Sequence, residues 1–268
     1  MAGPAGASTF LAPADAYDRH IGRYGESLAA GLIAAAGVGA GQRALDVGSG
    51  PGALTRALAG AVGKTGSVAA VDPSPPFAEA CRTRVPDADV RVAAAEALPF
   101  ADASFDAVLS QLVVNFMTDA PAGAREMRRV GRPGAVVAAC VWDYADGMTL
   151  LRRFWDAALH VDPAGAPAHD EGRVMRFCSP PELEALWRDA GLHGVRCGPL
   201  EASARYEDYD ALWAPLERGV APSGAYAVAL DPARRAALRE ELRRRLGEPR
   251  GPFELSARAW CVVGRVPA

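Results

Sequence analysis

From Arg43 onward, short apolar runs bounded by glycine, aspartate or proline alternate with longer segments whose apolar residues recur at helical spacing. That alternation is typical of a parallel β-sheet with crossover helices. In its first cycle, a strand is expected at residues 43–47, a glycine-rich turn follows, and Leu54, Leu58 and Val62 place an apolar stripe on a helix. The sequence therefore predicts an α/β fold with a doubly wound, mostly parallel sheet.

The same alternation continues through most of the chain, with two interruptions. Further strands are expected at residues 67–71, 90–94, 105–110, 135–142, 194–203 and 256–266, and further helices after Ser74, at 119–130 and at 180–190. Residues 143–178 and about 205–253 are interpreted as helical lid insertions. We predict a single domain over residues 1–268, with a seven-stranded core at about 40–142, 179–204 and 254–267 and an N-terminal cap at 1–39.

Composition narrows the classes of partner. The 29 Lys plus Arg against 32 Asp plus Glu and the pI of about 5.9 argue against a general polyanion binder, although a local basic patch stays open, and we expect no nucleic-acid partner. Five cysteines form no C-x-x-C pair and are odd in number, which fits neither a disulfide framework nor a zinc site. The cysteine usage and the lack of a secretory signal in residues 1–10 indicate a cytoplasmic protein. We expect no metal, because no ligand spacing fits one, and no membrane association, because the most apolar stretch, residues 28–41, is too short to span a bilayer.

A turn rich in glycine follows the first expected strand, with the sequence Asp46-Val47-Gly48-Ser49-Gly50-Pro51-Gly52. Open parallel sheets bind ligands at this place, outside the carboxyl ends of their strands. Glycine lacks a Cβ atom, so the chain can reverse tightly and bring backbone N–H groups against a ligand. The turn is therefore a candidate cofactor site rather than an ordinary connection.

Two classes of ligand fit this turn: a dinucleotide, and a ligand that carries an α-ammonium group. Gly48, Gly50 and Ala53 satisfy the dinucleotide pattern G-x-G-x-x-G/A, and Asp72 lies a few residues beyond the usual position of the ribose-binding acid. Asp46 separates the two classes, because it is an acid inside the strand, where a nicotinamide enzyme keeps apolar residues. A buried carboxylate needs a cationic or hydrogen-bonding partner, and a ligand with an α-ammonium group provides one.

At this point the chain resembles the class I methyltransferases that use S-adenosyl-L-methionine, and more narrowly the ubiquinone/menaquinone-type methyltransferase-like group. The resemblance rests on residues 45–52, on Val71-Asp72, on Glu96-Ala97-Leu98-Pro99-Phe100 with Ser104-Phe105-Asp106, and on Arg129-Val130 with Pro133-Gly134-Ala135. Together these motifs span about residues 42–142. The resemblance implies a Rossmann-like fold and S-adenosyl-L-methionine as the cofactor.

The resemblance also implies which residues bind the cofactor: Tyr17, Asp46, Gly48, Gly50, Asp72, Pro73, Ala95, Glu96, Gln111 and Leu112. Asp46 and the backbone of the glycine turn would hold the methionine portion, and Asp72 would accept hydrogen bonds from the ribose hydroxyls. The family often has Asp where this chain has Ala94, in Ala93-Ala94-Ala95-Glu96. Contacts to the adenine would then come from the backbone or from Glu96.

The acceptor site is less defined. Tyr24, Asn115, Phe116 and Trp142 are candidate substrate-binding residues, with simple packing as the alternative. Methyl transfer depends mainly on positioning the nucleophile. If the acceptor must lose a proton, His20 and His169 are the candidate bases.

The expected function is methyl transfer to a small-molecule acceptor by in-line displacement. The chain lacks the Asn-Pro-Pro-aromatic segment that amino-methylating nucleic-acid enzymes carry after the fourth strand. An NAD(P)-dependent oxidoreductase is one alternative, disfavoured by Asp46 and by the presence of a single lysine, Lys64. A non-catalytic protein that binds S-adenosylmethionine is the other, and the oligomeric state, monomer or homodimer, stays open.

Overall fold

The computed structural model describes residues 18–268, which divide into two compact units. The unit called here the sheet unit contains Gly25–Val141, Arg176–Glu201 and Ala259–Ala268. The other, called the insertion unit, contains the described residues up to Tyr24 together with Trp142–Met175 and Ala202–Arg258. The predicted boundaries of a single domain stay a prediction.

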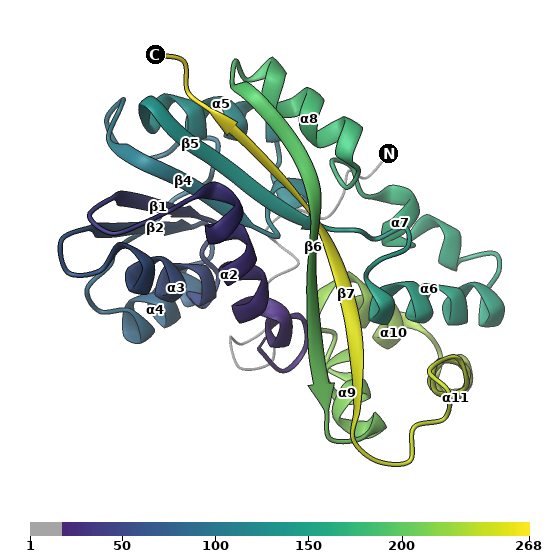
Figure 1. Ribbon diagram of the computed structural model, residues 1–268. Coiled ribbons are helices and arrows are strands. Elements are labelled where there is room, and N and C mark those ends of the chain that lie inside the picture. The colour runs from purple at the N-terminus through teal and green to yellow at the C-terminus, as the bar shows by residue number, and fades with distance from the viewer. Residues whose placement is uncertain (1–17) are drawn as a thin grey trace. The chain divides into compact units, whose positions relative to one another are not determined.

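The sheet unit is built on a seven-stranded sheet with the strand order β3-β2-β1-β4-β5-β7-β6 (Figure 1). The strands of this sheet are β1 (Arg43–Val47), β2 (Ser67–Asp72), β3 (Asp89–Val92), β4 (Phe105–Gln111), β5 (Gly131–Trp142), β6 (His193–Tyr206) and β7 (Phe253–Arg265). The last residue of β5, the part of β6 from Ala202 and the part of β7 up to Arg258 belong to the insertion unit. Strand β1 runs parallel to both β2 and β4, β2 to β3, and β4 to β5. The predicted α/β, mostly parallel, Rossmann-like fold is confirmed.

Helices pack on both faces of the sheet, and Asp46 of β1 points to the face covered by α3. The helices of this unit are α2 (Gly25–Ala36), α3 (Ala53–Val62), α4 (Pro75–Arg84), α5 (Ala120–Val130) and α8 (Pro180–Asp189). Leu45 and Val47 of β1 belong to the apolar core that also contains buried residues of α5 and α8. Because successive strand residues point to opposite faces, Asp46 points to the other face, where Thr55 of α3 contacts it.

The insertion unit is mostly helical. Its helices are α6 (Thr149–Val161), α7 (Glu171–Val174), α9 (Tyr209–Glu217), α10 (Ala221–Ala229) and α11 (Pro232–Arg245). Helix α6 contributes the buried Phe154 and Trp155, whose rings lie 6.4 Å and 5.2 Å from that of Tyr226 on α10. None of the described helices is long and apolar enough to cross a membrane.

Strand β5 begins earlier than the sequence predicts. The apolar run suggests a start at residue 135, whereas Gly131 already pairs with Phe105 of β4, and an irregularity in the register lies between Phe105 and Ala107. Arg132-Pro133-Gly134 looks like a turn in sequence. The neighbouring strand supplies the pairing that extends β5, and local sequence carries no sign of it.

Candidate functional site

The glycine turn between β1 and α3 has a backbone that only glycine adopts readily. The φ angles of Gly48, Gly50 and Gly52 are +80°, +50° and +97°. The amides of Gly48 and Ser49 donate to the carbonyl of Val71, at 2.8 Å and 2.9 Å. The turn is thereby attached to the carboxyl end of β2.

Asp46 lies fully buried beside this turn, with half of its carboxylate unsatisfied. Its Oδ2 accepts a hydrogen bond of 2.6 Å from Thr55 Oγ1, while Oδ1 is buried and has no hydrogen-bond partner among residues 18–268. The pKa of Asp46 is raised to about 7, mainly by burial and also by the nearby Asp72 carboxylate, while the Thr55 hydrogen bonds oppose both effects. A donor or cation supplied by a ligand would satisfy Oδ1 and favour the ionised form.

Asp72 ends β2 and reaches back to the turn. Its Oδ2 accepts from the amide of Gly50 at 2.8 Å, and its Oδ1 accepts from the amide of Ser74 at 2.8 Å. Burial raises the pKa of Asp72, and both amide hydrogen bonds lower it. Each carboxylate oxygen has more than one lone pair, so each can accept a further hydrogen bond from a ligand hydroxyl. Pro73, the next residue, is exposed.

The end of β4 lies beside the glycine turn and contributes Gln111, Leu112 and Val113 to the site. Gln111 Nε2 donates to the carbonyl of Gly25 at 3.1 Å, and its Oε1 is buried without a hydrogen-bond partner in the described chain. Leu112 has a φ of +63°, a conformation that non-glycine residues rarely adopt and that is common at functional sites. A Cβ atom at Gly48 would lie 2.4 Å from the side chain of Val113. The strand end is therefore packed directly against the glycine turn.

The remaining predicted residues of the sheet unit lie after β3 and β4 and differ in burial. Ala95 belongs to the apolar core, and Glu96 Oε1 accepts from the amide of Asp119 at 3.1 Å. Asn115 is buried and Phe116 half-buried, both in the short 3-10 turn after β4. Only Oε1 of Glu96 makes this hydrogen bond, so Oε2 can accept another one.

Two aromatic candidates for acceptor binding lie in the insertion unit. Tyr24 is fully buried, with its ring edge-on to Trp142 at 5.4 Å between centroids and its hydroxyl 3.4 Å from that of Tyr206. Such contacts favour the packing interpretation of both residues. Tyr17 lies outside the described residues.

The two candidate bases differ in environment. His20 is buried, and neither ring nitrogen has a partner within residues 18–268. Burial, and to a smaller extent the charge of Arg23, lower the pKa of His20 to about 4. His169 is exposed and its ring lies 5.4 Å from that of Tyr226. Nearby, the fully buried Glu171 accepts from Trp155 Nε1 at 3.0 Å, and burial raises the pKa of Glu171 to about 7.

The structure thus brings together Asp46, Gly48, Gly50, Asp72 and Gln111 at the carboxyl ends of β1, β2 and β4. Sequence reasoning missed two further residues of this site, Thr55 and Val113. Thr55 carried a signal, because it is a polar residue beside Leu54 in the apolar stripe of its helix. Val113 carried none.

Comparisons with known proteins identify the core of the chain. The family described as "Methyltransferase domain" matches residues 45–139. An uncharacterised protein of Mycobacterium tuberculosis is 39% identical over 116 residues, 41% of each chain. A ubiquinone/menaquinone biosynthesis C-methyltransferase of Chromobacterium violaceum is 40% identical over 106 residues, 38% of this chain and 43% of its own. The chain therefore spans less than half the length of these curated relatives.

Solved structures extend the likeness beyond the matched segment. A protein of Anaeromyxobacter dehalogenans, provisionally named a type II methyltransferase, is 25% identical with a TM-score of 0.62, covering 91% of this chain and 97% of its own. The [4+2]-cyclase SpnF is 18% identical with a TM-score of 0.56, covering 91% and 82%. The second likeness concerns the fold alone.

Proposed function

The chain carries a class I, S-adenosylmethionine-dependent methyltransferase domain, and we propose that it transfers a methyl group from S-adenosyl-L-methionine to a small-molecule acceptor. The family matches residues 45–139. The match covers less than half of each curated relative named above. The acceptor and the activity of this protein are therefore proposed here and are not taken over from those relatives.

One observation carries the cofactor proposal, namely the unsatisfied carboxylate of Asp46. A buried carboxylate oxygen without a donor costs free energy, which a cationic ligand group recovers. S-adenosylmethionine has an α-ammonium group of this kind, and a nicotinamide dinucleotide does not. The residues present therefore fit the cofactor that the family implies.

The neighbouring groups fit the same ligand. Asp72 can accept hydrogen bonds from ribose hydroxyls while keeping those from the amides of Gly50 and Ser74. A Cβ atom at Gly50 would meet nothing within 4 Å, so the turn is open at that point and a ligand can approach the backbone closely.

The cofactor supplies a methyl group already activated by a sulfonium, so the chain's own task is mainly to position the acceptor. His20 would be neutral near pH 7, because its pKa is lowered, and a neutral imidazole can accept a proton. His169, exposed on its turn, is a base open to solvent. Either histidine would serve only an acceptor that must lose a proton.

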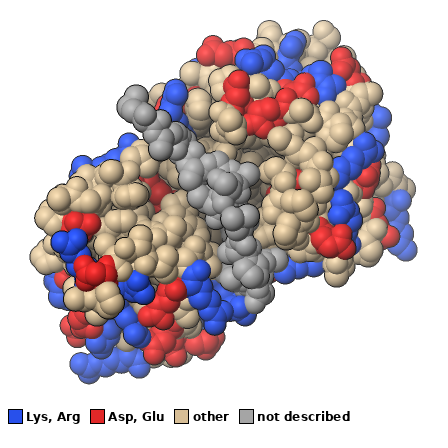
Figure 2. Space-filling model, turned by 180° about the vertical axis from the view of Figure 1, so that it is seen from behind, with Lys and Arg blue, Asp and Glu red and all other residues tan. Residues whose placement is uncertain are grey.

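A small molecule is proposed as the acceptor on two grounds. The named relative from Chromobacterium violaceum is a C-methyltransferase of ubiquinone/menaquinone biosynthesis. On the face shown in Figure 2, basic and acidic side chains of the described residues are interspersed, without a large patch of a single sign. Binding to a nucleic-acid backbone would be favoured by such a basic patch.

The cofactor is tested by calorimetric titration with S-adenosylhomocysteine, NADH and NADPH. We expect micromolar binding of S-adenosylhomocysteine alone, weakened at least about 100-fold by Asp72→Ala, since hydrogen bonds to a charged group contribute about 1.5–3 kcal/mol each. Asp89→Asn is the matched control, because Asp89 is an exposed acid of β3 that pairs with Arg91 at 2.6 Å. Tight nicotinamide binding without S-adenosylhomocysteine binding would overturn the proposal.

Turnover is tested separately, with methyl-labelled S-adenosylmethionine and a panel of small acceptors. Transfer of label to any of them supports the enzyme. Tight S-adenosylhomocysteine binding with no transfer across a broad panel would instead favour a non-catalytic binding protein.

A further inference from the structure

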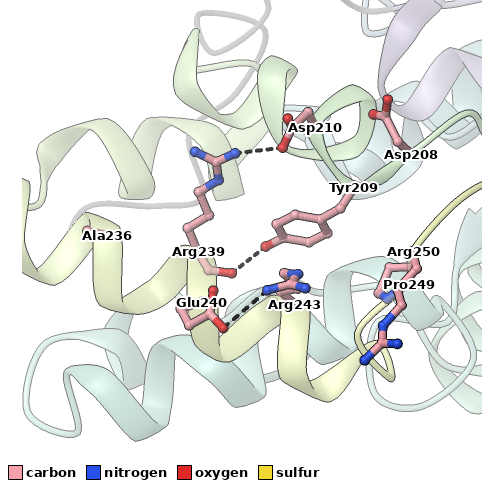
Figure 3. A pocket seen from close by; sticks show the side chains of 9 residues that line it. All are labelled: Asp208, Tyr209, Asp210, Ala236, Arg239, Glu240, Arg243, Pro249 and Arg250. Carbon is pink, nitrogen blue, oxygen red and sulfur yellow. Dashed lines mark hydrogen bonds and ion pairs between the residues drawn. The ribbon is translucent and has the colours of Figure 1, made fainter.

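The insertion unit contains a pocket of about 500 Å³, lined by none of the candidate cofactor-site or acceptor-site residues (Figure 3). Its walls come from the start of α9, from one face of α11 and from the loop between α11 and β7. That volume falls within the range of small-molecule sites, about 300–1,000 Å³. The pocket is therefore large enough for a ligand of its own.

Contacts between α9 and α11 hold these walls in place. Asp210 pairs with Arg239 at 2.6 Å, and the hydroxyl of the buried Tyr209 donates to the carbonyl of Arg239. Asp208 caps α9, accepting from the amide of Ala211 at 2.8 Å. Since the walls are fixed by their own contacts, a ligand would meet a preorganised site.

Two arginines of the pocket lack a close carboxylate partner. Arg243 reaches Glu240 only at 3.5 Å, whereas Arg244 and Arg245 on the same helix reach Glu241 at 2.6 Å and 2.7 Å. Arg250 has no hydrogen bond or ion pair with any residue that the structure describes. The donors left over in the pocket are thus guanidinium groups.

Two of the three acids of the pocket, Asp210 and Asp208, are compensated, and the third, Glu240, has only its long contact of 3.5 Å with Arg243. Asp210 has its ion pair with Arg239, and Asp208 lies at the amino end of α9, where the helix dipole stabilises negative charge. Tyr209 and Pro249 add apolar surface between the charged groups, with the tyrosine hydroxyl already used. The charges of Arg243 and Glu240 are only loosely paired with each other, so Arg250 remains as the charged group without a partner in the described chain, and the pocket favours an anion with an apolar part.

We propose that this pocket is a second ligand site, which binds a small organic acid through Arg243 and Arg250 with its apolar part against Tyr209. Guanidinium groups suit this task because their planar donors match a carboxylate or phosphate in bidentate fashion. The proposal does not depend on methyl transfer, since no residue of the cofactor site lines the pocket.

Binding of three probes to the full chain tests the proposal: benzoate, phenyl phosphate and the cation benzylamine, each by calorimetry at low salt. We expect benzoate or phenyl phosphate to bind with a dissociation constant of about 1 mM or tighter, and benzylamine not to bind. Inorganic phosphate tests the apolar contribution and should bind at least about fivefold more weakly than phenyl phosphate.

Arg243→Gln and Arg250→Gln should each weaken binding of the anionic probe at least about tenfold. Arg244→Gln is the matched control, because Arg244 lies on the same helix, pairs with Glu241 and does not line the pocket. Circular dichroism of each variant checks that it is folded. The proposal is overturned by absence of anion binding, by preference for benzylamine, or by an equal loss in Arg244→Gln.

Discussion

Thr55 Oγ1 donates a hydrogen bond of 2.6 Å to Asp46 Oδ2, and this bond leaves Asp46 Oδ1 as a buried carboxylate oxygen without a partner in residues 18–268. Thr55 in turn accepts from Cys81 Sγ at 3.4 Å. The pKa of Asp46 is thus set first by burial and then by Thr55 on α3 and by Asp72 at the end of β2. Cofactor binding should depend on how readily this carboxyl ionises.

The first prediction concerns pH. Because burial raises the pKa of Asp46 to about 7, the carboxyl is largely protonated in the free protein at lower pH and has no charge to offer an ammonium group. Affinity for S-adenosylhomocysteine should therefore rise as pH rises through about 7, and fall about tenfold per unit well below it. Calorimetric titrations between pH 5.5 and 7.5 measure this, and Asp46→Asn should remove the dependence.

Thr55→Val should shift the pH dependence of S-adenosylhomocysteine binding to higher pH. The Thr55 hydrogen bonds lower the pKa of Asp46, so without the hydroxyl the carboxyl stays protonated to a higher pH. A shift of the midpoint by about one to two pH units is expected. Thr55→Ser keeps the hydroxyl and should keep the wild-type midpoint, and a Thr55→Val profile identical to wild type would contradict the role given to this bond.

Gly48 and Gly50 should respond differently to alanine. At Gly48, a Cβ atom would lie 2.4 Å from Val113 and the φ is +80°, so Gly48→Ala should cost about 3 kcal/mol of unfolding free energy. At Gly50 only the φ of +50° opposes alanine, so about 1 kcal/mol is expected, together with a large loss of S-adenosylhomocysteine affinity.

Urea unfolding measures both costs. Adding Val113→Ala to Gly48→Ala should recover part of the stability, because the methyl groups in the way are removed. If the double variant is as unstable as the single one, the close approach of Val113 is not the cause.

Gln111→Met tests the link between the end of β4 and α2. The change keeps the size of the side chain but removes the hydrogen bond from Gln111 Nε2 to the Gly25 carbonyl, at an expected cost of about 1–2 kcal/mol. It also removes Oε1, so S-adenosylhomocysteine should bind more weakly if that oxygen contacts the cofactor. Gln42→Met is the control, since Gln42 also makes one partly buried hydrogen bond, to the amide of Gly39, at the other end of β1. Equal effects of both variants on binding would argue against a specific role for Gln111.

Glu171 should make the insertion unit less stable at higher pH. Its folded-state pKa is raised from 4.5 to about 7 by burial, so its contribution is fully present below pH 4.5 and is lost as pH rises through about 7. The loss is at most about 3 kcal/mol. Glu171→Gln keeps an acceptor for Trp155 Nε1 and should flatten the dependence of the melting temperature on pH. An unchanged slope in this variant would show that Glu171 does not contribute.

Local patterns predicted much of the fold. The strand at residues 43–47 and the helix after the glycine turn are present where expected, because apolar spacing and glycine content act over a few residues. The start of β5 at Gly131 was missed, since its pairing with Phe105 comes from a strand distant in sequence. Ser74 occupies the N-cap of α4 as expected, but its side chain makes no capping bond, while its amide donates to Asp72.

The sequence by itself determined the class of fold and the glycine turn between two acids, because those features depend on residue type and short spacing. Only the tertiary structure decided that Asp46 Oδ1 lacks a partner, that Thr55 fixes the other oxygen, and that Tyr24 packs against Trp142. The physical reason is that burial and hydrogen bonding depend on which distant residues meet. Asp46 and Thr55 are nine positions apart and meet only because α3 folds back over β1.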